Sequence, residues 1–420
     1  MDRNKLLQKW TYGAIIYLLL IVILTFTPVQ GFFPLCRQTW IFLTIGVVAS
    51  IFLTPSYYKT RALFFLIIYF FVIVLNSLVG DVYFHNIIRD VMEIYLLLLP
   101  SVMFYYAVTR PEGLYFCKWA VIAILTIIII ETFASYNLVT DTPAIIRELH
   151  HESLETGQKN DYLYPFFCLG LSNYSLPHAV PMLIPPLVML IRRKEIKISY
   201  KVFFLISLIS TIVLIWLSGS MTALMIGFFI FVISFLSVEG KQIFRQRKII
   251  VITLLMIPVV FSDEIKIYIL DFLENLFDSN KYFYDKILEF KASVISGQTT
   301  GDMEKREDLY SLSFSNLLNN LLIGTNTDVG NHSTILDRLA VLGFLGFLPL
   351  FYFCYYQFKM MMRHIPFKER IFLYESILAG IMMLLSKDMD DWESFLILFA
   401  IAPMIMLPFS SKKNFGIHAI

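Results

Sequence analysis

Charged residues are scarce in this chain, and no polar stretch is long enough to form a soluble catalytic domain. Asp, Glu, Lys and Arg make up only 16% of the 420 residues, whereas hydrophobic residues make up 58%. A soluble domain carries about 25% charged residues. Helices that are apolar on every side belong inside a bilayer. The composition therefore excludes an ordinary soluble enzyme and predicts an all-α polytopic membrane protein.

Cysteine and the common catalytic signatures are also scarce or missing. The four cysteines show neither metal-ligand spacing nor a disulfide framework, so we expect small apolar core residues at Cys36, Cys117, Cys168 and Cys354. There is no Walker loop, no HExxH motif and no nucleophile elbow. The net charge of +2 says nothing about partners, and we expect no metal, no cofactor and no nucleic-acid partner.

Apolar segments fill most of the chain. A membrane span needs about 20 mostly apolar residues, and twelve segments qualify: 11–29, 38–54, 62–79, 91–108, 115–134, 170–191, 200–218, 221–238, 248–262, 334–357, 371–386 and 392–409. The first lacks a small-residue cleavage site and is interpreted as a span, not as a signal peptide. The sixth contains four prolines and is expected to be kinked or partly unwound. The ninth is short.

Basic residues test the topology. With the N-terminus inside and the loops assigned alternately, most of the 34 Lys and Arg residues fall on the inner side. The short outer loops contain only Arg37, Arg89 and Lys387. Because Lys and Arg are enriched in cytoplasmic loops, we expect twelve spans with both termini in the cytoplasm.

The longest polar segment separates two groups of spans. We expect spans 1–9 in residues 1–262, an extracytoplasmic loop in 263–333 and spans 10–12 in 334–420. In the loop, Asp263–Ser279 places its apolar residues on one face, which predicts an interfacial helix whose face comprises Ile265, Ile269, Phe272, Leu273 and Leu276. Residues 302–322 predict a second helix along the membrane, with acidic residues in its first turn and Gly324 past its end.

Two places around this loop could bind an anion. Arg306 offers a planar fork of donors suited to phosphate oxygens; the alternative is a solvated charge paired with Glu304 or Asp308. Before the tenth span, His332 could exchange a proton near neutral pH, and Ser333 or Thr334 could cap a helix N-terminus suited to an anion. Asp337 and Arg338 follow about one turn into that span. The alternative there is a capping loop with a structural ion pair.

Three further sites are weaker candidates. His85, Arg89 and Glu93 share a face if helical, so Arg89 is either a second phosphate contact or the partner of Glu93. Lys387 and its acidic neighbours could bind sugar hydroxyls or form a solvated loop. Glu131 is expected to be buried and to face the bundle.

Three stretches resemble a known family. They are REDLYSLSFSNLLNNLLIGTN from Arg306, NHSTILDRLAVLGFLGFLPLF around His332, and SGSMTALMIGFF at 218–229. With the span count and the large outer loop, they are similar to the O-antigen polymerase and O-antigen ligase superfamily, including capsule repeat-unit polymerases. Many members carry an Arg where Met221 stands here, and Arg89 is a candidate substitute.

The resemblance implies glycosyl transfer at the outer face of a bacterial cytoplasmic membrane. The donor would be a sugar chain on undecaprenyl pyrophosphate, and the acceptor a hydroxyl of another lipid-linked repeat unit. Arg306, with Arg89 or Arg338, would stabilise the leaving pyrophosphate, so no metal is required. His332 would orient or deprotonate the acceptor. Tyr310, Ser333 and Asp337 would contact substrate, and a chain-length regulator is a further candidate partner.

Three alternatives stay open at this point. A ligase would transfer finished polymer to an acceptor glycolipid by the same chemistry. A flippase or transporter for lipid-linked sugars would suit twelve spans, although no internal repeat is evident. A purely structural membrane protein would leave the Arg and His placement unexplained.

Overall fold

Helices account for all the regular secondary structure in the part of the chain that can be described. The computed structural model describes residues 39–79, 84–139, 175–218, 220–237, 263–276, 281–296, 302–325, 329–330, 332–387 and 392–407, with a few positions between 13 and 23. These ranges contain no strand. The all-α class is therefore confirmed. Most of the first predicted span and all of the ninth lie outside the described residues.

Among the described residues, four helices are long and apolar enough to cross a bilayer. They lie within α5 (Phe84–Thr109), α6 (Gly113–Val139), α11 (Ile198–Leu217) and α17 (Thr334–His364). Shorter helices fall in other predicted spans: α3 (Thr39–Leu53), α4 (Arg61–Val79), α12 (Met221–Leu236) and α18 (Arg370–Ser386). Each of these eight helices thus overlaps a predicted apolar segment, while the number twelve stays a prediction.

The proline-rich sixth segment is interrupted, as expected. It consists of α9 (Ser175–Ala179), the 3₁₀ turn η3 (Val180–Leu183) and α10 (Ile184–Arg192). Pro181 lies at the start of the 3₁₀ turn, because proline lacks the N–H that an α-helix would use there. This segment packs against α11, α12 and α18, so the irregular backbone is enclosed by protein.

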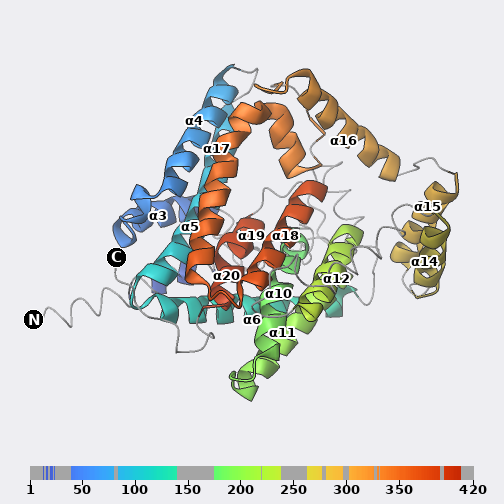
Figure 1. Cartoon of the computed structure of the whole chain (residues 1–420), viewed down its shortest axis with the longest axis horizontal. Coiled ribbons are helices and arrows are strands. Elements are labelled where there is room, and N and C mark those ends of the chain that lie inside the picture. Colours follow the sequence, from blue (N-terminus) through green and yellow to red (C-terminus); the bar gives the residue numbers. More distant parts are fainter. Residues whose placement is uncertain are drawn as a thin grey trace, which may run out of the picture.

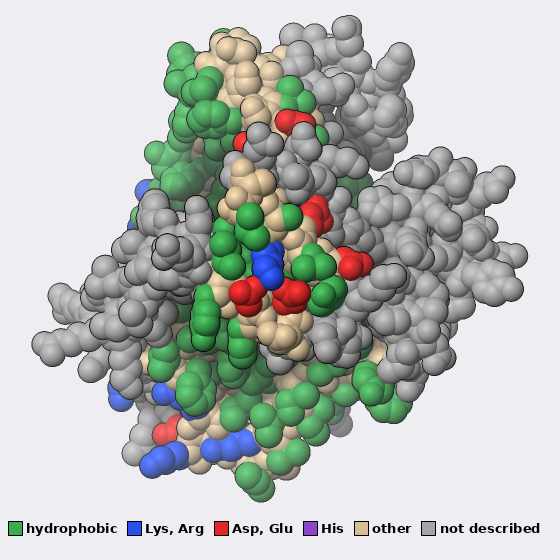
Figure 2. All heavy atoms as spheres, turned by 90° about the vertical axis from the view of Figure 1, so that its right-hand side faces the viewer, with side chains coloured by type: hydrophobic (Ala, Val, Ile, Leu, Met, Phe, Trp, Pro, Cys, Tyr) green, Lys and Arg blue, Asp and Glu red, His purple; other side chains and the backbone are tan. Residues whose placement is uncertain are grey.

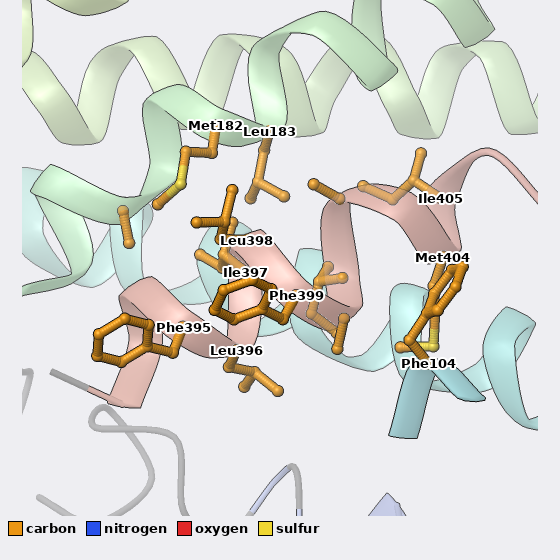
Figure 3. Close-up of a cluster of buried hydrophobic side chains, with 14 of the residues drawn as sticks. Phe104, Met182, Leu183, Phe395, Leu396, Ile397, Leu398, Phe399, Met404 and Ile405 are labelled. Atoms are coloured by element: carbon orange, nitrogen blue, oxygen red, sulfur yellow. The ribbon is translucent and has the colours of Figure 1, made fainter. Parts of the chain in front are cut away.

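The last apolar segment forms the centre of the bundle. It comprises α19 (Trp392–Leu396), the π-helical turn η5 (Ile397–Ile401) and α20 (Ala402–Ile405). Figure 3 shows its side chains meeting Met182 and Leu183 on one side and Phe104 on another. Phe395 and Phe399 stack with ring centroids 6.2 Å apart. A helix that is buried on all sides needs apolar residues throughout, which explains the unbroken hydrophobic run.

The predicted tenth span is bent, not continuous. Gly343 has φ 64°, a left-handed conformation that divides α17 into two limbs, and Figure 1 shows the sharp turn. The second limb runs beside α4. Its first N–H groups, from Phe344 and Leu345, donate to the carbonyls of Leu321 and Leu322 at 2.9 and 3.0 Å. The helix restart is therefore capped by a different segment.

The capping carbonyls follow α16 (Asp302–Asn319), whose chain reverses at Gly324 with φ 85°. A Cβ on Gly343 would lie 2.5 Å from the carbonyl oxygen of Leu322, and one on Gly324 would lie 2.1 Å from that of Val341. Only glycine permits such close backbone contact. The predicted helix ended at residue 322, but α16 ends earlier, at Asn319, and the conformation of Gly324 shows why glycine is needed where the chain reverses.

The segment before α16 forms a helical hairpin. It contains α14 (Asp263–Leu276), where an interfacial helix was predicted, and α15 (Lys281–Ser296), which was not predicted. On α14, Leu270 is buried with Ile287 of α15, whereas Phe272 from the predicted apolar face is exposed. Figure 2 shows a basic side chain flanked by acidic ones on this side of the molecule. Lys291 bonds to Asp271 and Glu274, at 2.6 and 2.7 Å, and these bonds raise its pKa.

At the α10–α11 turn, arginines are bound to protein groups. Arg192 donates to the carbonyls of Ser234, Phe235 and Ser237 at 3.2, 3.2 and 2.8 Å, and so caps the C-terminus of α12. Arg193 forms a buried ion pair with Glu369. This end of the bundle is where the charge pattern predicts the cytoplasm.

Candidate functional site

At the opposite end of the bundle, the end of α18 is held between α16 and the start of α17. The hydroxyl of Tyr310 donates to the carbonyl of Ser386 at 3.0 Å. The N–H and the hydroxyl of Thr334 both donate to the carbonyl of Lys387, each at 3.1 Å. These bonds bring three segments that are distant in sequence to one place and fix the loop that precedes α17.

Asp337 organises this loop from inside. One carboxylate oxygen accepts the N–H groups of His332 and Ser333 at 2.8 and 2.9 Å, and the other accepts the hydroxyl of Ser313 at 2.5 Å. Ser313 in turn accepts the N–H of Gly330 at 2.8 Å. Both oxygens of this buried carboxylate therefore serve the fold, and a role for Asp337 in substrate binding stays a prediction.

Of the two residues predicted to cap the tenth span, Ser333 is the N-cap of α17. Its side chain accepts the N–H of Leu336 at 3.2 Å and donates to the carbonyl of Leu384 at 3.4 Å. The capping loop considered as an alternative is thus present, and it holds His332 at the edge of the bundle. A contact between Ser333 and substrate stays a prediction.

His332 differs from these residues because its ring is not fully engaged. The ring lies edge-on to Tyr310, with centroids 5.4 Å apart. Its Nε2 atom is buried and has no hydrogen-bond partner among the described residues. Burial, followed by the charges of Lys387 and Arg306, lowers the pKa of His332 to about 4, against the raising effect of Asp337. The imidazole is therefore neutral at pH 7, with one nitrogen able to accept a proton.

Arg306 lies in the same neighbourhood, as the anion-site hypothesis requires. It is half-buried on the second turn of α16. Its charge acts on His332 and also on Tyr310, where it opposes the dominant effect of burial, which raises the pKa of that phenol. Tyr310 thus stays protonated and retains its hydrogen bond to Ser386. The structure brings Arg306, Tyr310 and His332 together.

Two further members of this site were not assigned to it from the sequence. Lys387, expected in a sugar-binding or solvated loop, lies close enough to act on His332. His178 of α9 lies within electrostatic reach of Lys387, Arg306 and His332, and its Nε2 is 2.8 Å from the hydroxyl of Ser220. Burying a titratable residue inside an apolar membrane segment costs free energy, so such residues tend to be functional. This rule could have identified His178 from the sequence. We call this group the cationic cluster: Arg306 and Lys387 carry its charge, and His332 and His178 lie within reach of that charge.

Arg338 has a structural partner instead of an open one. Its Nη2 is 2.5 Å from Glu93 Oε2, and Tyr69 donates to the other oxygen of Glu93 at 2.8 Å. Glu93 is therefore engaged by Arg338 and Tyr69, and Arg338 forms a structural ion pair with a partner that the sequence analysis did not assign to it. The side chain of Arg89, and residues Asp388, Asp390 and Asp391, lie outside the described residues. Roles for Arg338 and Arg89 in substrate binding stay predictions.

Within the described ranges, no group of three or more His, Cys, Asp or Glu side chains is placed to hold a metal ion. The fold and the site together define a class: a helical membrane protein with a cationic cluster at one end of its bundle. No protein-family model, curated protein or solved structure matches the chain.

Proposed function

We propose that this protein is a membrane glycosyltransferase that polymerises oligosaccharide repeat units linked to undecaprenyl pyrophosphate. The observation that supports this most directly is His332, whose Nε2 has no hydrogen-bond partner among the described residues and whose pKa is lowered by burial and by the charges of Lys387 and Arg306. One neutral base beside two fixed cations suits a reaction in which a hydroxyl loses a proton while a diphosphate leaves.

In this proposal the cations act on the leaving group. The bond between the anomeric carbon and the phosphate oxygen breaks, and the diphosphate leaves with the electron pair. Arg306 offers a planar fork of donors to the phosphate oxygens, and Lys387 adds a second positive charge. Because both charges are in place before the substrate binds, they stabilise the developing charge with little reorganisation.

His332 acts on the acceptor. The acceptor hydroxyl forms the new bond to the anomeric carbon and transfers its proton to the neutral imidazole. Tyr310 and the bonds to Asp337 hold the ring and the backbone of His332 in position. The neighbouring cations disfavour the imidazolium, but the departing diphosphate supplies the opposite charge at the moment of transfer.

The apolar helices support a location of this chemistry in a membrane. We propose the outer face of the bacterial cytoplasmic membrane, with both termini in the cytoplasm, because the basic turn between α10 and α11 lies at the opposite end from the cationic cluster. The polymer would then form as O-antigen or capsule on the extracytoplasmic side.

The test is a reconstituted assay with purified protein and lipid-linked repeat units, with product length read on gels. We expect His332→Ala and Arg306→Ala to abolish chain growth and, in cells, to leave surface polysaccharide as single repeats. His364→Ala and Lys291→Ala are matched controls, because these residues lie at the far end of α17 and on the α14–α15 hairpin.

Normal long chains from His332→Ala or Arg306→Ala would contradict the assigned roles. Transfer of finished polymer to a glycolipid without chain growth would identify a ligase instead. Movement of lipid-linked repeats across the vesicle membrane without any new glycosidic bond would identify a transporter.

A further inference from the structure

The last turns of α16 and the residues that follow expose large apolar side chains. Leu318 is 58% exposed, and Leu321, Leu322 and Ile323 are 44%, 60% and 78% exposed. The beginning of the same helix is polar, with Glu307, Asp308 and Ser311 on its surface. A cluster of exposed leucine and isoleucine marks a contact surface more often than a surface that faces water.

This apolar surface is continuous with the outward face of α17. The carbonyls of Leu321 and Leu322 accept the N–H groups of Phe344 and Leu345, so the two segments lie side by side. Phe344 and Leu345 are themselves 46% and 58% exposed, at the top of a helix long and apolar enough to span a bilayer. The exposed face of the span therefore extends onto the end of α16.

The neighbouring helix α4 gives the depth of this surface. A Cβ on Gly346 would lie 3.2 Å from Val72, so these two residues are level with each other. From Val72, α4 continues to Leu75 and Leu78, which are 59% and 65% exposed. At 1.5 Å per residue, α4 reaches about 9 Å beyond this level, whereas the bend at Gly343 is only about 4.5 Å beyond it. Measured along the axis of α4, the bend and the end of α16 therefore do not reach as far as the last apolar residues of α4.

We infer that the segment Leu318–Ile323 is inserted among the acyl chains of the bilayer, while the polar beginning of α16 carries Arg306 in water. This goes beyond a helix that lies along the membrane, because only one end enters the hydrocarbon. The occupant of the exposed surface is lipid, since the surface continues the face that α17 presents to the bilayer. The inference does not depend on the proposed function.

The test is nitroxide labelling of single cysteines in the full-length protein in liposomes, after replacement of the four native cysteines and a check of thermal stability. We expect labels at Ile323 and Leu322 to collide several-fold more often with oxygen than with a water-soluble nickel chelate. Leu348 on α17, which is 40% exposed, is the control for lipid contact. Ser311 and Ser315, both exposed on α16, are the aqueous controls.

Three results would overturn the inference. A label at Ile323 that is as accessible to nickel as the one at Ser311 would place this segment in water. A label shielded from both quenchers would show a protein partner or a second copy of the chain. Unimpaired membrane assembly of Ile323→Asp, compared with Ser311→Asp, would show that no hydrocarbon surrounds the side chain.

Discussion

Arg192 and Arg193 at the α10–α11 turn are both bonded to protein groups, whereas His332 at the other end of the bundle leaves Nε2 without a partner in the described residues. At the first end these two charges meet carbonyls or a carboxylate, so they support the fold. At the second end Arg306 and Lys387 both act on one neutral histidine. The comparison separates charges that are paired within the fold from charges that act together on one residue of the candidate site.

The largest expected effect is on catalysis at the open end. Arg306→Gln removes a cation that the proposal places on the leaving diphosphate, so we expect the rate of chain growth to fall by about 10²- to 10³-fold. Thermal unfolding in detergent should change little, because Arg306 is only half-buried. If Arg306→Gln had a normal kcat, or failed to fold, Arg306 would not differ from the structural arginines at the other end of the bundle.

The next effect is on stability at the closed end. Glu369→Ala leaves Arg193 buried without its carboxylate, which should cost about 3–5 kcal/mol of unfolding free energy. Activity per folded molecule should be unchanged. The double variant Arg193→Met/Glu369→Leu should recover most of the stability, since it removes both charges. If Glu369→Ala instead reduced kcat without loss of stability, the closed end would have to take part in the chemistry.

A smaller effect is expected at the bend of α17. Gly343→Ala places a side chain at φ 64° and against the backbone of Leu322, so it should cost at least about 1–2 kcal/mol. Gly227→Ala is the control, because its new Cβ would approach only side-chain atoms of Ile215, Ile184 and Pro181. Thermal unfolding of the two variants in the same detergent measures the difference. Equal melting temperatures of the two variants would show that the bend does not require glycine at position 343.

The smallest effect is on pH dependence. His332 must be neutral to accept a proton, so kcat/KM should stay constant as the pH falls from 7 and should decline only near pH 4. Lys387→Met removes a positive charge that lowers the pKa of His332, so the decline should move to higher pH, by less than about one unit. Lys291→Met should leave the profile unchanged. A profile that moves downward in Lys387→Met would contradict the electrostatic assignment.

Local features of the fold were accessible from the sequence. Apolar runs indicated most of the helices, the prolines indicated that the sixth segment is interrupted, and Ser333 was one of two residues predicted to cap the tenth span. These predictions succeed because propensity and capping act within a few residues. The neighbourhood of Arg306 and His332 followed from two motifs at the ends of one loop.

Features that depend on distant partners were not accessible. Arg338 pairs with Glu93, which lies far away along the chain, and no spacing in the sequence indicates this contact. Gly343 lies in an apolar run that reads as a continuous span, and only the backbone of Leu322 and Gly324 explains its conformation. His178 joined the site through the packing of α9 at the same end of the bundle, which no spacing in the sequence encodes.

A helix that restarts after a bend has amide hydrogens with no acceptor of their own, and in hydrocarbon water cannot satisfy them. In α17 the carbonyls of Leu321 and Leu322 accept hydrogen bonds from two of these N–H groups. The segment that follows α16 is therefore a component of the span, although it belongs to a loop by sequence. Any replacement or shortening of that loop would have to preserve the turn at Leu321 and Leu322. Without this turn, the second limb of α17 would lose its N-terminal cap.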